Sequence, residues 1–393
     1  MHPIVKPALR RGWRDLNTVQ FGMAPAHAII LGPVDTATGS FLDLLNGTRG
    51  LPLLREEGRR MGFPDGHVDG LLDRLARSGL LDDNTGGGPA ADTLRKKKAV
   101  LDRLRPDLAS LSLVAPEPGE GMKRLAARRS LRVQVRGAGR VGVILASLLA
   151  GAGVGQVDVR DSGCVEPSDV APGGLPAESI GQRREEAARR AVRQAAPEGP
   201  PRTPPDSEQV GLSLVILTPR DGLAVHAPDP AATESLITSG TPHLYAGVVE
   251  GTGVVGPLVL PGDTGCAGCL DQGRTDRDPT WPRLVAQWRS GQQRQVPACD
   301  LALAAGVAGM AAGHALAYLD GELPSSAGAR WEASVPGFDW HARPVWPHPA
   351  CLCGAAEKGK KGERASEDGE PHETMAEQQP YAARLSGNWR AHV

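Results

Sequence analysis

The sequence has no excess of charge of either sign, because its 393 residues include 44 Lys and Arg against 45 Asp and Glu. A protein that binds nucleic acid or an anionic membrane surface needs a basic field, so this count argues against both partners. The first 30 residues lack the apolar core of a signal peptide, and we identify no apolar run of the roughly 18 to 20 residues that span a bilayer. These absences predict a cytoplasmic protein whose partners are peptides or small molecules.

Cysteine is also scarce, with six residues in the chain. In a reducing compartment, so few thiols are more typical of metal ligands or reactive groups than of a disulfide framework. Glycine and proline are abundant by contrast, at 50 and 34 residues, which indicates many turns and linkers. The length allows two domains with appendages.

Residues 131–161 contain a strand, a glycine-rich loop, a helix and a second strand in direct succession. Gly137 permits a tight turn, Gly139 lets the backbone approach a pyrophosphate, and Gly142 allows the helix and strand to pack closely. Asp161 ends the second strand, where a carboxylate can bind a ribose hydroxyl. The unit predicts an α/β, Rossmann-like fold whose crevice either holds a nucleotide or is an emptied copy of such a site.

Residues 1–83 have the pattern of a small separate α+β module. Two short strands, over Thr18 to Phe21 and Ala28 to Leu31, surround a turn, and helices are expected over about 36–45 and about 50–61. A third helix is indicated by apolar residues that recur at i, i+3, i+4 and i+7, namely Val68, Leu71, Leu72 and Leu75. This order of elements predicts a winged-helix-like module.

Winged helices often bind DNA, but the charges of this module argue against it. Residues 1–83 hold ten Lys or Arg and ten Asp or Glu, whereas a duplex-binding module needs a basic face. A short sheet beside a helix can instead take up an extended peptide as an added strand. We therefore predict peptide recognition, with Thr18 to Phe21 as the contact strand, the alternative being a purely structural cap.

The remaining boundaries follow from composition. Residues 84–130 predict a linker that contains one helix, over Asp92 to Arg105, and residues 131–354 form the main domain. Few apolar side chains occur in residues 355–393, so we expect a disordered tail there.

Two close cysteine pairs lie far apart in the main domain, at Cys266 and Cys269 and at Cys351 and Cys353. Four thiolates brought together form a closed tetrahedral zinc site, and a site without an open position is structural. His348 could replace one thiolate, since only one residue separates the second pair. The alternative is two unrelated buried pairs.

Cys299 immediately precedes a long helix of small residues. A thiol at a helix amino terminus has a depressed pKa and can act as a nucleophile or acyl acceptor. The alternative is an inert, buried cysteine at the start of a helix.

A glycine-rich loop, an acid-ended second strand, a later Cys-x-x-Cys, a cysteine that opens a small-residue helix and a last cysteine pair follow one another in residues 131–354. In this order they resemble the ThiF/MoeB/HesA family of ubiquitin-activating-type adenylyltransferases. The resemblance implies binding of ATP and magnesium, adenylation of the carboxyl terminus of a small protein, a structural zinc and a homodimer.

Carried over position by position, the resemblance also implies residue roles. It puts the loop residues Gly137, Gly139, Arg140 and Gly142 at the phosphates and Asp161 at the ribose. Zinc would bind the two cysteine pairs, and Cys299 would match the thiol that accepts the activated acyl group in some members.

Four departures from the family pattern concern the nucleotide site. Gly163 replaces a second acid, and the arginine that reaches the triphosphate is absent. Arg184 stands where a lysine normally binds phosphate, and Pro219 and Arg220 displace Asp221, the remaining candidate for the cofactor site, along the chain. Because loss of a clamp on phosphate charge costs orders of magnitude in rate, these changes predict a degenerate ATP site.

Together with the peptide module, the altered site resembles a narrower group, the ThiF-like leader-peptide-binding proteins that accompany YcaO cyclodehydratases in making thiazole- and oxazole-modified peptides. The matching segments are residues 136–142, 169–174, 255–262 and 348–353. The resemblance implies a docking protein that captures the leader of a precursor peptide and presents it to a separate cyclodehydratase.

Two other functions fit parts of the sequence. An active ATP-dependent adenylyltransferase would use the glycine loop and Asp161 to activate the carboxyl terminus of a ubiquitin-like protein or a peptide. An NAD-dependent oxidoreductase explains the glycine loop but neither the four cysteines nor the peptide module.

Overall fold

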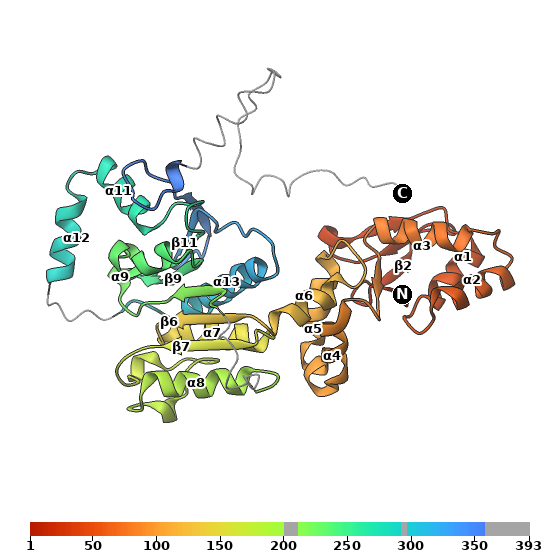
Figure 1. Ribbon diagram of the computed structural model, residues 1–393, viewed down its shortest axis with the longest axis horizontal. Helices are drawn as coiled ribbons and strands as arrows, with labels where there is room; N and C mark the ends of the chain where they lie inside the picture. Colours follow the sequence, from red (N-terminus) through yellow and green to blue (C-terminus); the bar gives the residue numbers. More distant parts are fainter. Residues whose placement is uncertain (200–210, 292–296, 358–393) are drawn as a thin grey trace, which may run out of the picture. The chain divides into compact units, whose positions relative to one another are not determined.

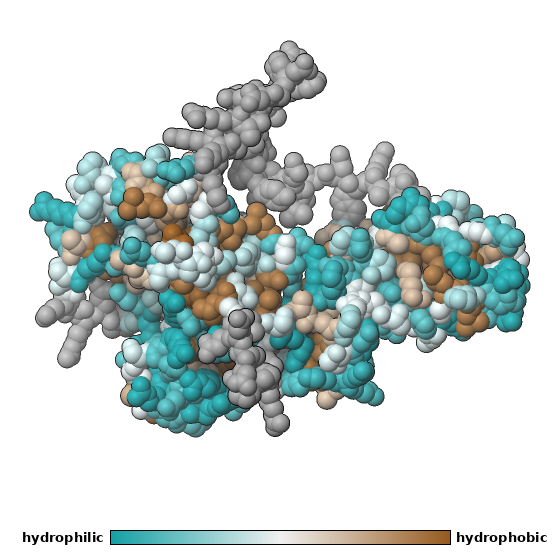
Figure 2. Space-filling view, in the orientation of Figure 1, coloured by the Kyte–Doolittle hydropathy of each residue, from teal (hydrophilic) through white to brown (hydrophobic). Residues whose placement is uncertain are grey.

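The computed structural model describes residues 1–199, 211–291 and 297–357, and the predicted tail beyond residue 357 lies outside them (Figure 1). The chain divides into two compact units, Met1–Arg129 and a second unit that begins at Ser130. On the face in view, hydrophilic residues cover much of each unit, and apolar patches interrupt this cover within each unit (Figure 2).

The amino-terminal unit begins with a small antiparallel sheet and three helices. The sheet has the order β2 (Arg11–Trp13), β3 (Val19–Phe21) and β4 (Ile29–Leu31). The helices are α1 (Thr36–Leu44), α2 (Leu51–Arg60) and α3 (His67–Arg77), and a separate ladder pairs β1 (Pro3–Val5) with β5 (Leu81–Asp83). The strands and helices expected within residues 18–77 are thereby confirmed.

The core of this part forms where the apolar face of α3 meets the sheet. Leu71 and Leu75 of α3, Phe41 of α1, and Val19 and Phe21 of β3 are all buried in one cluster. The periodic leucines of α3 are buried on one side of the helix, as their spacing predicts, because residues three and four apart share one helix face.

Three helices, rather than one, occupy residues 84–130: α4 (Gly88–Lys96), α5 (Lys98–Val114) and α6 (Glu120–Arg128). The glycine-rich segments that precede α4 and α6 resemble linkers in the sequence. In the structure, Gly87 and Gly119 adopt φ values of 96° and 85° in tight turns directly before these helices. Glycine reaches this left-handed region without steric cost. These turns lead the chain into α4 and α6, and the three helices pack together around a shared apolar cluster.

Buried polar contacts tie these helices to residues 1–83. The Asp82 carboxylate accepts the Gly119 N–H at 2.7 Å and the Ser112 hydroxyl at 2.5 Å. The Lys6 ammonium, only 2% exposed, donates to the Ala115 carbonyl at 3.1 Å. Residues 1–83 and the three helices consequently form one folded unit.

The second unit is built on a seven-stranded mixed sheet of order β12-β11-β10-β9-β8-β6-β7. Its parallel half contains β6 (Arg132–Arg136), β7 (Gln156–Arg160), β8 (Leu214–Leu217) and β9 (His243–Val249). Its antiparallel half adds β10 (Thr252–Val259), β11 (Ala329–Ser334) and β12 (His341–Pro344). The parallel half confirms the Rossmann-like α/β prediction.

Helices complete this unit. They are α7 (Arg140–Gly151), α8 (Arg184–Ala195), α9 (Gly222–His226), α10 (Glu234–Thr238), α11 (Ala267–Arg277), α12 (Trp281–Ser290) and α13 (Leu301–Leu319). The loop between β6 and α7 carries the glycines, and α13 packs against α7 and against β9 and β10. Near the carboxyl ends of the parallel strands, these connections form the candidate site described below.

The expectation that no apolar run is long enough to span a bilayer is wrong for α13. Within the described part of the chain, this helix alone has both the length and the composition to cross a membrane. In the structure, however, Leu303, Val307, Ala311 and Ala315 form a fully buried stripe in the core of the sheet unit. Helices in the core of a soluble fold meet the same criterion, so α13 is a core helix by its packing.

Candidate functional site

The glycine loop after β6 is closed against the end of β8. A Cβ atom at Gly137 would lie 1.9 Å from the Thr218 carbonyl oxygen, and one at Gly142 would lie 2.0 Å from the Gly137 carbonyl oxygen. The Thr218 hydroxyl donates to that same Gly137 oxygen at 2.9 Å. Larger residues at either glycine would push the loop off β8, so both positions require glycine for local geometry.

Asp161 is bonded inside the chain through both carboxylate oxygens. One oxygen accepts the Ala138 N–H of the glycine loop at 2.6 Å, and the other accepts an Arg184 Nη–H at 2.8 Å. The Asp161 and Arg184 side chains are only 10% and 5% exposed. A ribose hydroxyl would therefore have to displace one of these bonds to reach the carboxylate.

Arg184 lies at the centre of a network of charged residues. It contacts Asp169 at 3.1 Å, Asp169 contacts Arg220 at 2.8 Å, and Arg220 contacts Glu166 at 2.7 Å. Burial opposes the charged form of Arg184, but hydrogen bonds and charges from Asp161 and Asp169 outweigh it and raise the pKa of Arg184. Its guanidinium is thus matched by carboxylates of the chain itself and is not free to neutralise a phosphate.

Arg220 also covers the part of the loop that a pyrophosphate would approach. A Cβ at Gly139 would lie 2.9 Å from the Arg220 Cγ, so the arginine side chain packs directly over this glycine. The sequence pattern Pro219-Arg220 by itself indicates only that Asp221 is displaced along the chain. An arginine near the end of β8, where an acid is expected, is the sequence feature that points to this contact. The sequence does not show that Arg220 packs over Gly139, because the fold brings the two residues together.

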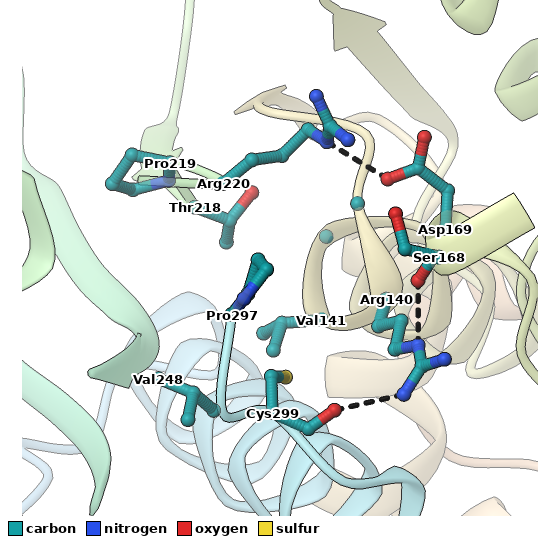
Figure 3. A pocket seen from close by; sticks show the side chains of 12 residues that line it. Arg140, Val141, Ser168, Asp169, Thr218, Pro219, Arg220, Val248, Pro297 and Cys299 are labelled. Carbon is teal, nitrogen blue, oxygen red and sulfur yellow. Dashed lines mark hydrogen bonds and ion pairs between the residues drawn. The ribbon is translucent and has the colours of Figure 1, made fainter. Parts of the chain in front are cut away.

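A cavity of about 230 Å³ remains beside the loop (Figure 3). Arg140 spans one side of it, donating to the Ser168 carbonyl at 2.6 Å and to the Cys299 carbonyl at 2.8 Å. The other lining residues include Gly139, Gly142, Thr218, Arg220, Val248 and Pro297. The cavity therefore brings together Gly139, Arg140, Gly142 and Cys299 from the candidate set.

Asp221 is not among the residues that line this cavity. Its carboxylate accepts the Leu223 N–H at 3.0 Å and caps α9. A carboxylate at this position satisfies a helix terminus, which is a local structural role.

Cys299 borders the cavity, and the pKa of its thiol is raised rather than lowered. Burial raises the pKa of the Cys299 thiol, and the Asp300 charge adds to this while Arg140 opposes it. The predicted pKa depression is therefore wrong. Asp300, not Cys299, is the amino-terminal cap of α13 and accepts the Leu303 N–H at 2.9 Å, so a carboxylate occupies the position at which a thiolate would be stabilised.

The four cysteines of the two pairs converge, with their sulfur atoms all within 4.8 Å of one another. The Cys266–Cys351 and Cys269–Cys353 sulfur separations are 3.6 and 3.5 Å, and the Cys266–Cys269 separation is 3.9 Å. A tetrahedral zinc with bonds of about 2.3 Å needs sulfurs about 3.8 Å apart. The donor set and its spacing fit a structural zinc, which would fasten the segment after β12 to α11.

His348 does not share in this set. Its Nε2 atom lies 2.9 Å from an Asp276 carboxylate oxygen, and its Nδ1 atom accepts the Ala350 N–H at 3.2 Å. Its backbone N–H donates to the Cys269 sulfur at 3.3 Å, which lowers the pKa of the Cys269 thiol together with the larger effect of the Cys266 thiol. His348 thus supports the thiolates from outside the ligand set.

The predicted peptide-contact strand, Thr18 to Phe21, corresponds to the central strand of the amino-terminal sheet. β3 pairs with β2 on one side and with β4 on the other. A strand with partners on both sides has no backbone groups left for a third, so this prediction is wrong. In the described chain the open edges are those of β2 and β4, which pair with β3 alone in this sheet.

The model of the ThiF family matches residues 111–355, which is more than half of the chain. The chain belongs to the ThiF family. The match includes the glycine loop, the cavity and all four converging cysteines.

Solved structures extend this likeness beyond the ThiF region. E. coli MccB in complex with AMPCPP and MccA is 13% identical, with a TM-score of 0.64, and the match covers 90% of this chain and 100% of that one. MccB in complex with N-formylated MccA, described as a microcin C7 biosynthetic enzyme, gives the same values. PaaA is 16% identical with a TM-score of 0.61, and the match covers 87% of this chain and 99% of that one. These TM-scores show a shared fold.

No curated protein sequence matches this ThiF-family chain. Two contacts described above concern the glycine loop of this fold. Asp161 occupies a loop amide, and Arg220 packs over Gly139.

Proposed function

We propose that this ThiF-family protein is a docking protein that captures the leader of a ribosomally made precursor peptide and presents it to a separate YcaO-type cyclodehydratase. The observation that carries the proposal is the open edge of β4 in the amino-terminal unit. The internal pairing of Asp161 and Arg184 supports a binding role over catalysis. A homodimer and a cytoplasmic location remain predictions from the sequence.

The two open edges of the small sheet differ in chemistry. β2 and its flanks carry Arg10, Arg11 and Arg14, whereas β4 and the preceding residue read Ala-Ile-Ile-Leu with no charge. Charged residues on an edge strand discourage pairing with another strand, and an uncharged apolar edge permits it. β4 is therefore the edge suited to an added peptide strand.

The backbone alternation selects Ile30 as the contact residue of β4. The backbone of Arg10 and Arg14, which flank β2, forms hydrogen bonds with the backbone of Gly22 and Thr18. The N–H and C=O groups of even-numbered residues in β3 therefore point toward β2, and those of odd-numbered residues point toward β4. Ile30 lies opposite Gln20, and its N–H and C=O consequently point away from β3. Its side chain is 38% exposed.

MccB has been solved together with MccA, and these complexes support a peptide as the partner of this fold. The MccB structures also support the competing function, since MccB is called a biosynthetic enzyme and has been solved with ATP. If this chain adenylates a carboxyl terminus, it catalyses ATP–pyrophosphate exchange that depends on Asp161. We expect no such exchange.

The proposal is tested with peptides that correspond to the short reading frames next to this gene, synthesised with a fluorescent label and titrated with the full chain. Ile30→Pro removes the outward N–H but no bond to β3, so the sheet should persist while affinity falls at least tenfold. Ile30→Val keeps the outward N–H and a β-branched side chain, so this variant should leave affinity within about twofold. Equal losses in both variants, or no loss on deleting residues 1–83, would refute the proposal.

A further inference from the structure

A second groove of about 310 Å³ lies on the amino-terminal unit, away from the β4 edge. Its lining includes Arg10, Gly12, Trp13, Arg14, Gln20 and Met23. Resting on the proposed function, we infer that this groove binds an acidic segment of the same precursor peptide, outside the segment that pairs with β4.

The positive charges of the groove are largely unmatched. Arg10 has no side-chain partner among the residues that the structure describes, and Arg14 donates to the neutral Gln20 amide oxygen at 2.8 Å. The adjacent Asp15 carboxylate accepts the Asn17 N–H at 2.8 Å, which lowers the pKa of Asp15, and the charge of Arg14 contributes to this lowering without a salt bridge between them. Among the described residues, Arg11 is the one arginine of the groove in a salt bridge, with Asp43 at 2.8 Å. Two guanidiniums are therefore left to pair with carboxylates of a ligand.

Gly12 opens the space between these two arginines. Residues 10, 12 and 14 of a strand point to the same side, and a Cβ at Gly12 would meet nothing within 4 Å. The position needs no glycine for its backbone, since its φ is not in the left-handed region. The gap can instead admit side chains of a bound segment, with the 72% exposed Met23 providing an apolar contact.

The dimensions require two separate segments of one peptide. A strand added to β4 would lie three strand spacings, or about 14 Å, from β2. Four or five extended residues span that distance. An acidic segment a few residues from the pairing segment would thus reach the groove, and the balanced charge of residues 1–83 favours a peptide over a nucleic acid.

The same labelled neighbouring peptides test this inference. Arg10→Gln and Arg14→Gln should each weaken binding about two- to fivefold, and the double variant about tenfold with a shallower salt dependence. Gly12→Leu should weaken binding by filling the gap, and Gly12→Ala should do so less. Arg59→Gln, which removes the same charge on α2 where Arg59 pairs with Glu56, should leave affinity unchanged.

Replacing Asp and Glu of the peptide by Asn and Gln should weaken binding to the wild-type chain but not to the double arginine variant. If the peptides bind and none of these changes matters, the acidic subsite is wrong while the docking function stands. Tighter binding of a single-stranded oligonucleotide of equal length would also overturn the subsite. If no neighbouring peptide binds the wild-type chain, the proposed function fails and the subsite with it.

Discussion

At the scale of single residues, Arg184 is a buried cation that pairs with two carboxylates. Its side chain is 5% exposed and contacts the buried carboxylates of Asp161 and Asp169. Arg184→Gln removes one ion pair from Asp169 and the ion pair of Asp161, so the free energy of unfolding should fall by about 3 kcal/mol. Chemical denaturation measures this, with Arg189→Gln as control because Arg189 pairs with Glu185 on the surface. A control variant that is equally destabilised would contradict the assignment.

The residue scale also shows where sequence reasoning ends. The glycine spacing predicted the loop, because each glycine's backbone requirement is local. The bond from the Ala138 N–H to Asp161 and the placement of Arg220 over Gly139 join residues far apart in the chain. The spacing of the glycines does not encode these two contacts, which determine how much of the loop backbone a ligand can reach.

At the scale of elements, the cysteine pairs join α11 to the segment that follows β12. Cys266→Ser should remove about one equivalent of zinc, since a hydroxyl is a poor substitute for a thiolate. Cys164→Ser is the matched control, because Cys164 is exposed and lies outside the cluster. Metal analysis after dialysis distinguishes the two variants. Retention of zinc by Cys266→Ser would refute the tetrathiolate site.

Helices and strands are predictable where apolar residues recur over several turns or alternations, and not where an element has only three residues. The four periodic apolar residues of α3 define its buried face. β2 consists of Arg, Gly and Trp, with no alternation over its three residues, and it was missed. Its omission made β3 look like an edge strand, which explains the wrong contact strand.

At the scale of the whole molecule, residues 1–129 contain cores of their own. A fragment spanning 1–129 should unfold cooperatively, whereas one spanning 1–83 loses the partners of Asp82 and Lys6. Hydrogen bonds to charged groups contribute about 1.5 to 3 kcal/mol each, so the shorter fragment should be less stable by on the order of 3 kcal/mol. Thermal and urea unfolding of both fragments provide the comparison. Equal stability would mean that the helices after residue 83 contribute nothing to the fold.

The brevity of β4 limits how firmly this molecule can hold a guest by main-chain bonding. Three residues turn only Ile30 outward, and two hydrogen bonds contribute about 3 kcal/mol at most, whereas micromolar affinity needs about 8. Most of the attraction must then come from side chains, which makes capture selective for sequence. It also makes release fast, as suits a carrier that must give up each cargo before it can accept another.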